Sequence, residues 1–292
     1  MNLLIVTADD FGLHPAVNRA VAQAASEGVL TAASLMVGSP AALDAARCAR
    51  ELPGLSVGLH LVLADGWSVL PQRSIPALVD AQGRFGNNMV RDGVRFFALP
   101  TVRRQLEAEI RAQFQAFADT GLVLDHVNAH KHFHLHPTLL EMLLRIGAEF
   151  GAPAVRLPRE PAWVARRAGG TIAGPAVAGL LSPWLALMRR RLRLAGIAHN
   201  DHVFGMSDSG SMDEARLLEI LTRLPEGVTE IYLHPAVASG AEIAAIMSGY
   251  RHEDELAALL SPRVRAAITA SGAQTCGFRA LSATRAAQRR AA

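Results

Sequence analysis

Two neighbouring carboxylates follow the first apolar run of the chain. Residues 3–8 read LLIVTA, which is typical of a buried parallel strand, and Asp9 and Asp10 come directly after them. Carboxylates at the end of a buried strand lose hydration, and this loss is costly unless they bind something. One of the two can ligate a metal ion while the other remains free as a general base. The pair therefore indicates a metal site with hydrolytic chemistry.

The histidines are concentrated in one short segment. Five of the 11 histidines lie within residues 126–136, namely His126, His130, His132, His134 and His136. If this segment is extended, residues two apart share a face, and His130, His132 and His134 point the same way. One ion cannot take so many imidazoles, so we expect some of them to orient ligands or to contact substrate. The cluster is a second indication of a metal site.

Two further histidines stand in or after apolar runs elsewhere in the chain. His60 lies in LSVGLHLVL (55–63), and His234 follows VTEIYL (228–233). Taken alone, His60 would be interpreted as a core histidine and His234 as a loop residue. The carboxyl ends of parallel strands, however, meet at one face of an α/β barrel. We therefore expect the acidic pair and these histidines to gather at one rim.

One carboxylate and two imidazoles make a plausible ligand set for a divalent metal ion. Such a set leaves positions open for water and substrate. The ion would acidify the water and polarise a carbonyl group. A histidine from another strand end would then protonate the leaving amine. We expect one divalent ion; the imidazole pair favours zinc, and magnesium is the alternative.

The elements that must position these residues alternate between strand and helix patterns. Strands are predicted over 3–8, 32–37, 55–63, 122–128, 154–157 and 228–233, and helices over 15–27, 40–51, 101–118, 137–150, 211–224, 253–260 and 262–270. This alternation favours parallel βαβ units, in an open α/β sheet or an irregular (β/α) barrel. We expect a single α/β domain over residues 1–282, followed by a flexible basic tail over 283–292.

The composition narrows the function classes. The chain has 292 residues, of which 50% are hydrophobic, and this suffices for one large core. A net charge of +3, dispersed basic residues and 5% aromatics argue against a nucleic-acid partner. The two cysteines, Cys48 and Cys276, form no CxxC and no disulfide framework is expected. Because no secretory signal pattern is visible, a cytoplasmic location is the expectation.

A hydrophobic insertion is expected at about 161–198. Its residues 168–188 carry no charge and are flanked by arginines on both sides. That length would suffice to span a bilayer, but the glycines and prolines in it favour a buried or lid helix. Peripheral membrane contact through 168–188, with the arginines as anchors, is the alternative.

Four motifs carry a resemblance to a known family. TADDFG around Asp9 and Asp10, GLHL around His60, NAHKHFHLHP around His130 and EIYLHPA around His234 resemble the YdjC-like carbohydrate deacetylases in order and spacing, from residue 2 to about residue 280. The resemblance implies an irregular (β/α) barrel of the glycoside hydrolase/deacetylase type and a divalent metal. Asp10, His60 and His130 would hold the metal. Asp9 would be the general base, and His234 would be the general acid or stabilise the developing charge.

The same resemblance suggests residues that contact substrate. His132, His134 and Asn128 would lie near the substrate, and Arg156 would orient Asp9 or bind substrate. Asn128 stands where many relatives carry an aspartate. A carboxylate role is therefore not expected at this position, although its amide can still hydrogen-bond the substrate.

The KHFHLHP motif and the insertion most resemble the hopanoid biosynthesis-associated branch. This branch implies an N-acetylglucosaminyl lipid as substrate, with acetate and the glucosaminyl lipid as products, at the inner face of the cytoplasmic membrane. Three alternatives stay open: a deacetylase of soluble chito-oligosaccharides, a metal-dependent phosphoesterase, and a non-catalytic carrier with a structural metal. Phosphoesterases commonly use two or three metals, and a carrier needs neither a free base nor an acid. The sequence gives no indication of the oligomeric state.

Overall fold

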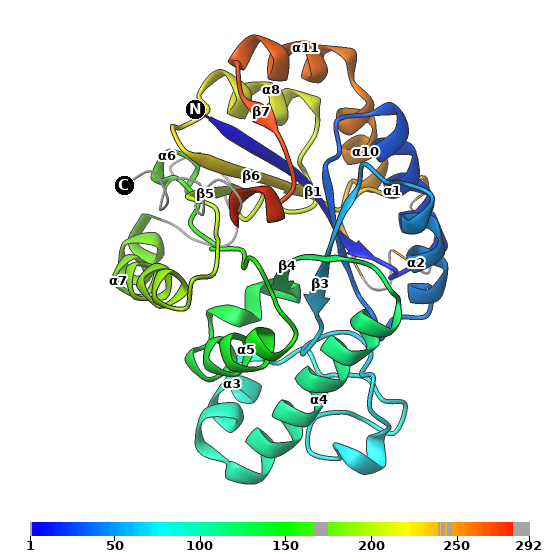
Figure 1. Cartoon of the computed structure of the whole chain (residues 1–292), viewed down its shortest axis with the longest axis vertical. Helices are drawn as coiled ribbons and strands as arrows, with labels where there is room; N and C mark the ends of the chain where they lie inside the picture. The colour runs from blue at the N-terminus through cyan, green and yellow to red at the C-terminus, as the bar shows by residue number, and fades with distance from the viewer. Residues whose placement is uncertain (1, 166–174, 239, 241–242, 244–246, 283–292) are drawn as a thin grey trace.

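A parallel sheet forms the centre of the molecule (Figure 1). The computed structural model describes residues 2–165, 175–238, 240, 243 and 247–282, so the expected tail at 283–292 lies outside the described residues. The strand order is β4-β3-β2-β1-β6-β5, with β7 beside β1, and each pair of neighbours is parallel. The strands are β1 (Leu3–Phe11), β2 (Ala32–Leu35), β3 (Ser56–Leu61), β4 (Leu124–Ala129), β5 (His202–Phe204), β6 (Val228–Leu233) and β7 (Gln274–Thr275).

Residues 154–159 curl this sheet toward closure. The Val127 N–H of β4 donates to the Ala154 carbonyl at 2.9 Å, and the Val203 N–H of β5 donates to the Arg159 carbonyl at 2.9 Å. The segment thus contacts both outer strands of the sheet. The expectation of an irregular (β/α) barrel is confirmed, in the form of a parallel sheet curled into a half-barrel with helices around it.

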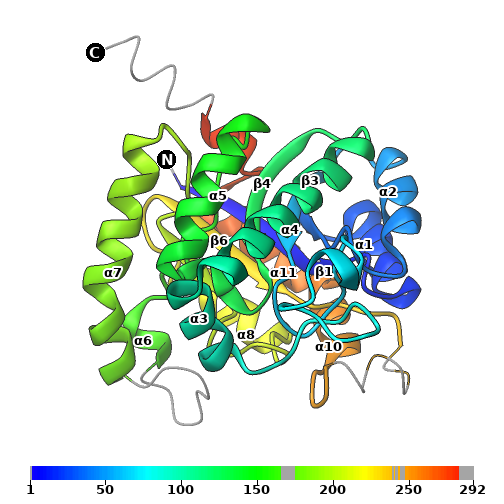
Figure 2. The same cartoon turned by 90° about the horizontal axis from the view of Figure 1, so that it is seen from below.

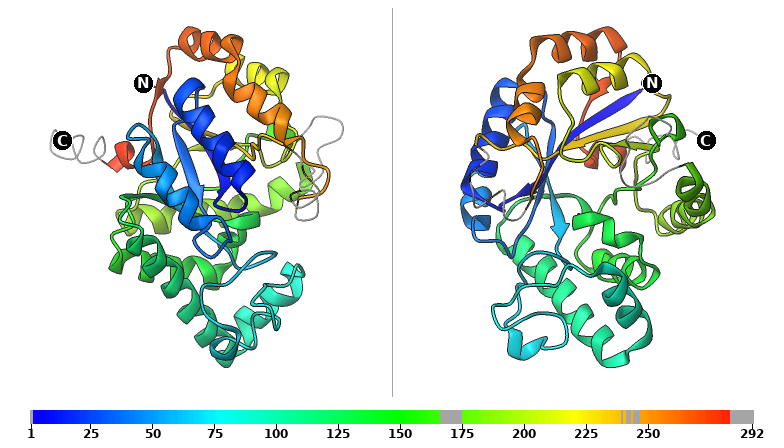
Figure 3. Two further views of the ribbon diagram at one scale, coloured as in Figure 1. Left: turned by 90° about the vertical axis from the view of Figure 1, so that its right-hand side faces the viewer. Right: turned by 180° about the vertical axis from the view of Figure 1, so that it is seen from behind.

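The helices lie around the outside of the sheet (Figures 1 and 3). In α4, for example, Val102, Leu106, Ile110 and Phe114 form the buried stripe that the sequence predicts. The helices are α1 (Pro15–Glu27), α2 (Ala42–Arg50), α3 (Met89–Ala98), α4 (Pro100–Asp119), α5 (Pro137–Glu149), α6 (Ala162–Ala165), α7 (Pro175–Leu194), α8 (Glu214–Thr222), α10 (His252–Leu260) and α11 (Pro262–Ser271), with 3-10 turns η1 (Gln72–Ser74) and η2 (His130–Leu135). The sequence did not predict α3, β5 or β7.

The histidine cluster is not extended, and the expectation of one shared face is wrong. Residues 130–135 form η2, in which Lys131 and His132 have φ of 53° and 54°. These two residues lie in the left-handed region and kink the segment, so side chains two apart do not share a face as they would in a strand. The histidines of this segment therefore reach different partners.

The described parts of the hydrophobic insertion are residues 161–165, which include α6, and residues 175–198, which include α7. Helix α7 runs along the outer edge of the molecule (Figure 2). Met188 and Leu192 lie one turn apart and are fully buried, and the Trp184 indole N–H donates to the carbonyl of Leu135 in η2 at 2.8 Å. Leu187 and Leu194 are exposed. Within the described residues, no helix is long and apolar enough to cross a membrane. Residues 166–174, which belong to the predicted insertion, lie outside them.

Candidate active site

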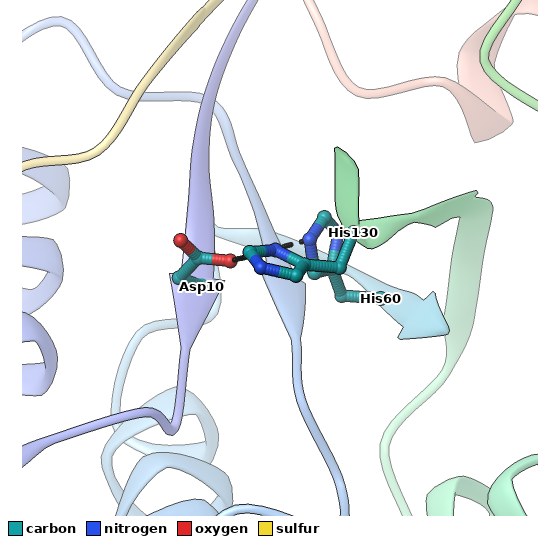
Figure 4. Close-up of side chains that lie close together, drawn as sticks. All are labelled: Asp10, His60 and His130. Carbon is teal, nitrogen blue, oxygen red and sulfur yellow. Dashed lines mark ion pairs between the residues drawn. The ribbon is translucent and has the colours of Figure 1, made fainter. Parts of the chain in front are cut away.

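Asp10, His60 and His130 point toward one another at the carboxyl end of the sheet (Figure 4). Asp10 comes from β1, His60 from β3, and His130 directly follows β4. Asp10 Oδ1 lies 3.3 Å from His60 Nε2 and 3.1 Å from His130 Nδ1, and one ligand atom from each residue falls within 4.8 Å of the others. Three elements far apart in sequence thus deliver an oxygen and two nitrogens to one point.

An irregularity in β1 turns both acids toward this point. Successive side chains of a regular strand alternate between faces, which would separate Asp9 from Asp10. Here the register with β2 shifts between Ala8 and Phe11, and Asp10 has φ of 61°. A non-glycine residue in this left-handed region costs on the order of 1–3 kcal/mol. Both carboxylates consequently approach His60, Asp9 Oδ1 at 4.0 Å from Nδ1 and Asp10 Oδ1 at 3.3 Å from Nε2.

The three residues fit a divalent metal ion. Both carboxylate oxygens of Asp10 are buried and, within the part of the chain that the structure describes, have no partner with hydrogen-bond geometry. Burial raises the pKa of Asp10, but the His130 and His60 imidazoles outweigh it and hold the pKa well below the ordinary value. An ionised buried carboxylate without hydrogen bonds is costly unless a cation is bound. One oxygen and two imidazole nitrogens suit zinc, with a position left for water or substrate.

Asp9 is held by a buried arginine. The Arg156 guanidinium donates to Asp9 Oδ2 at 2.6 Å and to Oδ1 at 3.0 Å, and it also donates to both carboxylate oxygens of Glu230 on β6 at 2.8 and 2.6 Å. Burial by itself raises the pKa of Asp9; the charge and the hydrogen bonds of Arg156 oppose it, and the pKa is held well below the ordinary value. Arg156 is 0% exposed, and its donors are directed at the two carboxylates.

Asn128 contacts the opposite side of the His60 ring. Its amide oxygen lies 2.6 Å from His60 Nδ1, and its amide nitrogen lies 2.9 Å from Ser34 Oγ and 3.3 Å from Asp9 Oδ1. The residue is 0% exposed. Its amide therefore lies behind the metal ligands, among protein groups.

His132 and His134 diverge from His130. His132 Nε2 lies 2.8 Å from the Tyr232 hydroxyl, and His134 Nε2 donates to the Arg156 carbonyl at 3.1 Å. Burial, with the Arg156 charge added, lowers the pKa of His134 to about 3 and that of His132 well below its ordinary value. Both imidazoles are therefore neutral near pH 7.

His234 lies at the end of β6, with its ring beside Tyr232 and Tyr250. Its side chain is 10% exposed, and burial lowers its pKa to about 4, against the opposing charges of Asp10 and Asp9. The carboxylate of Glu255 lies 4.0 Å from His234 Nδ1, and burial raises the pKa of Glu255 to about 7. A neutral imidazole beside two carboxylates is a group that can take up a proton and release it.

The sequence predictions missed Glu230, Tyr232 and Glu255. Glu230 had a detectable signal, because it is the one charged residue inside the apolar run VTEIYL. Tyr232 gave no such signal, because tyrosine is common in strands. Glu255 gave none either, because it is one of three adjacent acids in α10. Only the folded chain shows that these three side chains contact the predicted site residues.

Comparison with known proteins identifies the family. Residues 3–270 match the family model described as YdjC-like protein. The chain belongs to the YdjC-like protein family. The expected family is therefore confirmed, while the hopanoid-associated branch stays a prediction.

Three relatives of this YdjC-like chain are named as deacetylases. A carbohydrate deacetylase of Geobacillus stearothermophilus is 30% identical over 94% of this chain and 96% of that protein. A chitooligosaccharide deacetylase of Serratia marcescens is 31% identical over 92% and 95%. A carbohydrate deacetylase of Brevibacillus brevis is 39% identical, but the match covers 53% of this chain and 59% of that protein.

One solved structure is similar over the whole fold. A protein of Enterococcus faecalis V583, provisionally assigned to cellobiose-phosphate cleavage, has a TM-score of 0.74 and 26% identity, with 96% of this chain and 99% of that chain covered.

Proposed function

We propose that this YdjC-like protein is a metal-dependent hydrolase that removes the acetyl group of an N-acetylated sugar. The observation that carries the proposal is the Asp10, His60 and His130 cluster, with the ionised Asp9 and the neutral His234 at the same rim. The relatives named as carbohydrate and chitooligosaccharide deacetylases support the same chemistry.

Asp10, His60 and His130 would hold one divalent ion, with zinc favoured by the imidazole pair and magnesium as the alternative. When bound, such an ion polarises the amide carbonyl and acidifies the attacking water. The residues of the chain must then move protons from that water to the leaving nitrogen.

Asp9 would accept the proton of the attacking water. Its two oxygens are engaged by Arg156, but a carboxylate has about four lone-pair sites, so it retains acceptor capacity. Because the pKa of Asp9 is far below neutral, Asp9 stays ionised between turnovers and holds the proton only transiently. Arg156 orients Asp9 in this scheme, and Glu230 holds Arg156 in place by accepting from the same guanidinium.

His234 would hand a proton to the leaving amine or stabilise the developing charge. With a pKa of about 4, its imidazole rests in the neutral form at pH 7 and takes up a proton within the cycle. The Glu255 carboxylate, 4.0 Å from Nδ1, would stabilise the protonated ring. Three further residues hold site groups in place in this proposal. His132 contacts Tyr232, His134 contacts the Arg156 carbonyl, and Asn128 contacts His60.

A cleft beside the rim could receive the rest of an oligosaccharide. Its volume is about 760 Å³, and it is lined by residues that follow β1, β2 and β3, including Leu13, Pro40 and Trp67. Arg19 and Asp44 add polar groups. Apolar walls with a few polar groups are typical of small-molecule sites, and the Trp67 indole could stack on a sugar ring.

An exposed apolar face on α3 supports an N-acetylglucosaminyl lipid as a second candidate substrate. Val90, Val94 and Phe97 are 80%, 63% and 67% exposed and lie three or four residues apart on one helix face. Figure 1 shows α3 beyond the carboxyl end of β3, and the Phe96 ring of α3 packs against Phe133 of η2 with ring centroids 5.3 Å apart. An apolar face beside the site could touch a membrane that carries an N-acetylglucosaminyl lipid.

Acetate release tests the proposal. Purified protein is incubated with N-acetylated chitobiose and with an N-acetylglucosaminyl lipid in vesicles, each with and without chelator, followed by addition of zinc or magnesium. Release that chelator abolishes and metal restores supports the deacetylase, and the preferred substrate decides between sugar and lipid. Release of phosphate from a disaccharide phosphate, with none of acetate, would contradict the proposal in favour of a phosphoesterase. Sugar binding without any turnover would contradict it in favour of a carrier.

A further inference from the structure

A line of buried side chains runs from Asp125 to the back of His60. His126 Nδ1 lies 2.9 Å from Asp125 Oδ2, and His126 Nε2 lies 3.0 Å from Ser34 Oγ. Ser34 Oγ lies 2.9 Å from the Asn128 amide nitrogen, and the Asn128 oxygen lies 2.6 Å from His60 Nδ1. Ser34, His126 and Asn128 are each 0% exposed, so water does not compete for these contacts.

The chemistry of Asp125 fixes the direction of the protons along this line. Its carboxylate can only accept, and it also accepts the backbone N–H groups of Phe278 and Arg279. His126 Nδ1 must therefore carry a proton, and when the ring is neutral its Nε2 accepts the Ser34 hydroxyl proton. The oxygen of Ser34 is then left to accept, which it does from the amide nitrogen of Asn128.

This direction decides which nitrogen of His60 is free. With its nitrogen toward Ser34, Asn128 presents its oxygen to His60 Nδ1, so Nδ1 carries the proton. The lone pair of His60 then lies on Nε2, the atom that faces Asp10 Oδ1 at 3.3 Å. A metal ligand needs this tautomer, because a protonated Nε2 cannot bind an ion.

Arg156 favours the opposite orientation of the Asn128 amide. With the Asn128 amide reversed, its oxygen would lie 3.0 Å from both terminal nitrogens of Arg156 and accept from them, and its nitrogen would donate to His60 Nδ1. The reversed amide leaves the proton of His60 on Nε2 and the site unable to bind metal through that atom. Another residue is therefore needed to keep the Asn128 amide in the unreversed orientation, which Arg156 disfavours.

We propose that His126 is a positioning residue of the metal site, which acts through Ser34 to hold the Asn128 amide in the orientation that frees His60 Nε2. The space for its ring comes from Gly58 on β3, where any Cβ would collide with the His126 imidazole. The proposal goes beyond deacetylation, although it rests on His60 being a metal ligand.

Metal affinity of apoprotein variants tests this role without any substrate. Zinc is titrated against a chromophoric chelator with the wild type and with Ser34→Ala, His126→Phe and the matched control Ser39→Ala. Ser39 is also buried, but its hydroxyl contacts Met36 instead of the line. We expect zinc affinity to fall by about 10–100-fold in the first two variants, as for other residues behind a metal ligand, and to stay unchanged in the control.

Asn128→Asp distinguishes a loss of zinc affinity caused by the orientation of the Asn128 amide from a loss caused by misfolding. A carboxylate accepts from His60 Nδ1 whichever way it is turned, so it needs no positioning. Added to Ser34→Ala or His126→Phe, it should restore zinc affinity to within a few-fold of Asn128→Asp alone. Unchanged affinity in Ser34→Ala and His126→Phe, or a loss that Asn128→Asp does not repair, would overturn the proposal.

Nitrogen NMR of the metal-free protein reads the tautomer directly. We expect the proton of His60 on Nδ1 in the wild type and on Nε2 in Ser34→Ala; the same tautomer in both would also overturn the proposal. Absence of zinc binding by the wild type would instead contradict the proposed function, and the two failures are thereby distinguished.

Discussion

Arg156 and Asp9 form a bidentate ion pair inside the barrel, with N–O distances of 2.6 and 3.0 Å, although 146 residues separate them in the chain. The same guanidinium also donates to both carboxylate oxygens of Glu230. The pair fixes the plane of the Asp9 carboxylate at the rim, and it explains how an acid can stay ionised in a buried site.

Replacing Asp9 by asparagine should abolish turnover and spare metal binding. The amide cannot accept a proton as a base, and general bases contribute roughly 10²–10⁴-fold to rate. Acetate release should fall by that factor while zinc content, measured by atomic emission, stays at the wild-type level. A variant with normal turnover would remove Asp9 from the mechanism.

Arg156→Lys should lower turnover and stability together. A lysine cannot donate in the planar fork that serves both Asp9 and Glu230. Breaking a buried charge pair costs on the order of 3–5 kcal/mol, and a lysine that retains the charge should lose less than Arg156→Met. Urea unfolding of the two variants measures this order, and equal stability of Arg156→Met and the wild type would contradict it.

Removing one ligand should remove the metal. His60→Ala and His130→Ala each leave two ligands, so zinc should dissociate under chelator concentrations that the wild type resists. His14→Ala is a matched control, because His14 caps α1 through Ala16 and is not in the ligand cluster. Metal retention by both ligand variants would place the ion elsewhere.

Acid should destabilise the protein partly through His134. Burial lowers the pKa of His134 to about 3, whereas an unfolded histidine titrates near 6.5. Below pH 6.5 the unfolded chain binds the extra proton, so the stability that this histidine contributes is lost as the pH falls toward 3. The loss should reach about 2 kcal/mol at pH 5.

His134→Asn isolates this contribution. The difference in unfolding free energy between the wild type and His134→Asn should be about 2 kcal/mol smaller at pH 5 than at pH 7.5. The reason is that only the wild type loses stability when the histidine of its unfolded chain is protonated. Denaturant unfolding at the two pH values measures the difference. A constant difference would show that the pKa of His134 in the folded protein is the same as in the unfolded chain.

Trp67→Ala should weaken binding of long substrates. If the cleft lined by Trp67 receives a second sugar ring, KM for N-acetylated chitobiose should rise several-fold with little change in kcat. KM for a single N-acetylated sugar should not change. Equal effects on both substrates would contradict a role for the cleft.

Some of the site could be predicted from residue types and order alone. An acidic pair after an apolar run, and histidines at later strand ends, predict a shared rim because parallel strands bring their carboxyl ends together. The (β/α) barrel followed from the alternation of strand and helix patterns for the same reason. These are local signals, and each can be detected within a window of about ten residues.

Other features depend on contacts between distant residues. The turn of η2 sends His130, His132 and His134 to Asp10, Tyr232 and the Arg156 carbonyl, and the alternation rule for an extended segment cannot anticipate it. The contacts of Glu230 with Arg156 and of Glu255 with His234 form only because β6 and α10 pack beside the site.

The residue types at the strand ends can be read from the sequence alone, and they predict the metal ligands. The face that each side chain takes and the partners that each histidine contacts follow only from the folded chain. The physical reason is that φ at Asp10, burial at Arg156 and hydrogen bonds at His60 depend on partners more than 20 residues away, and no periodicity along the chain encodes them.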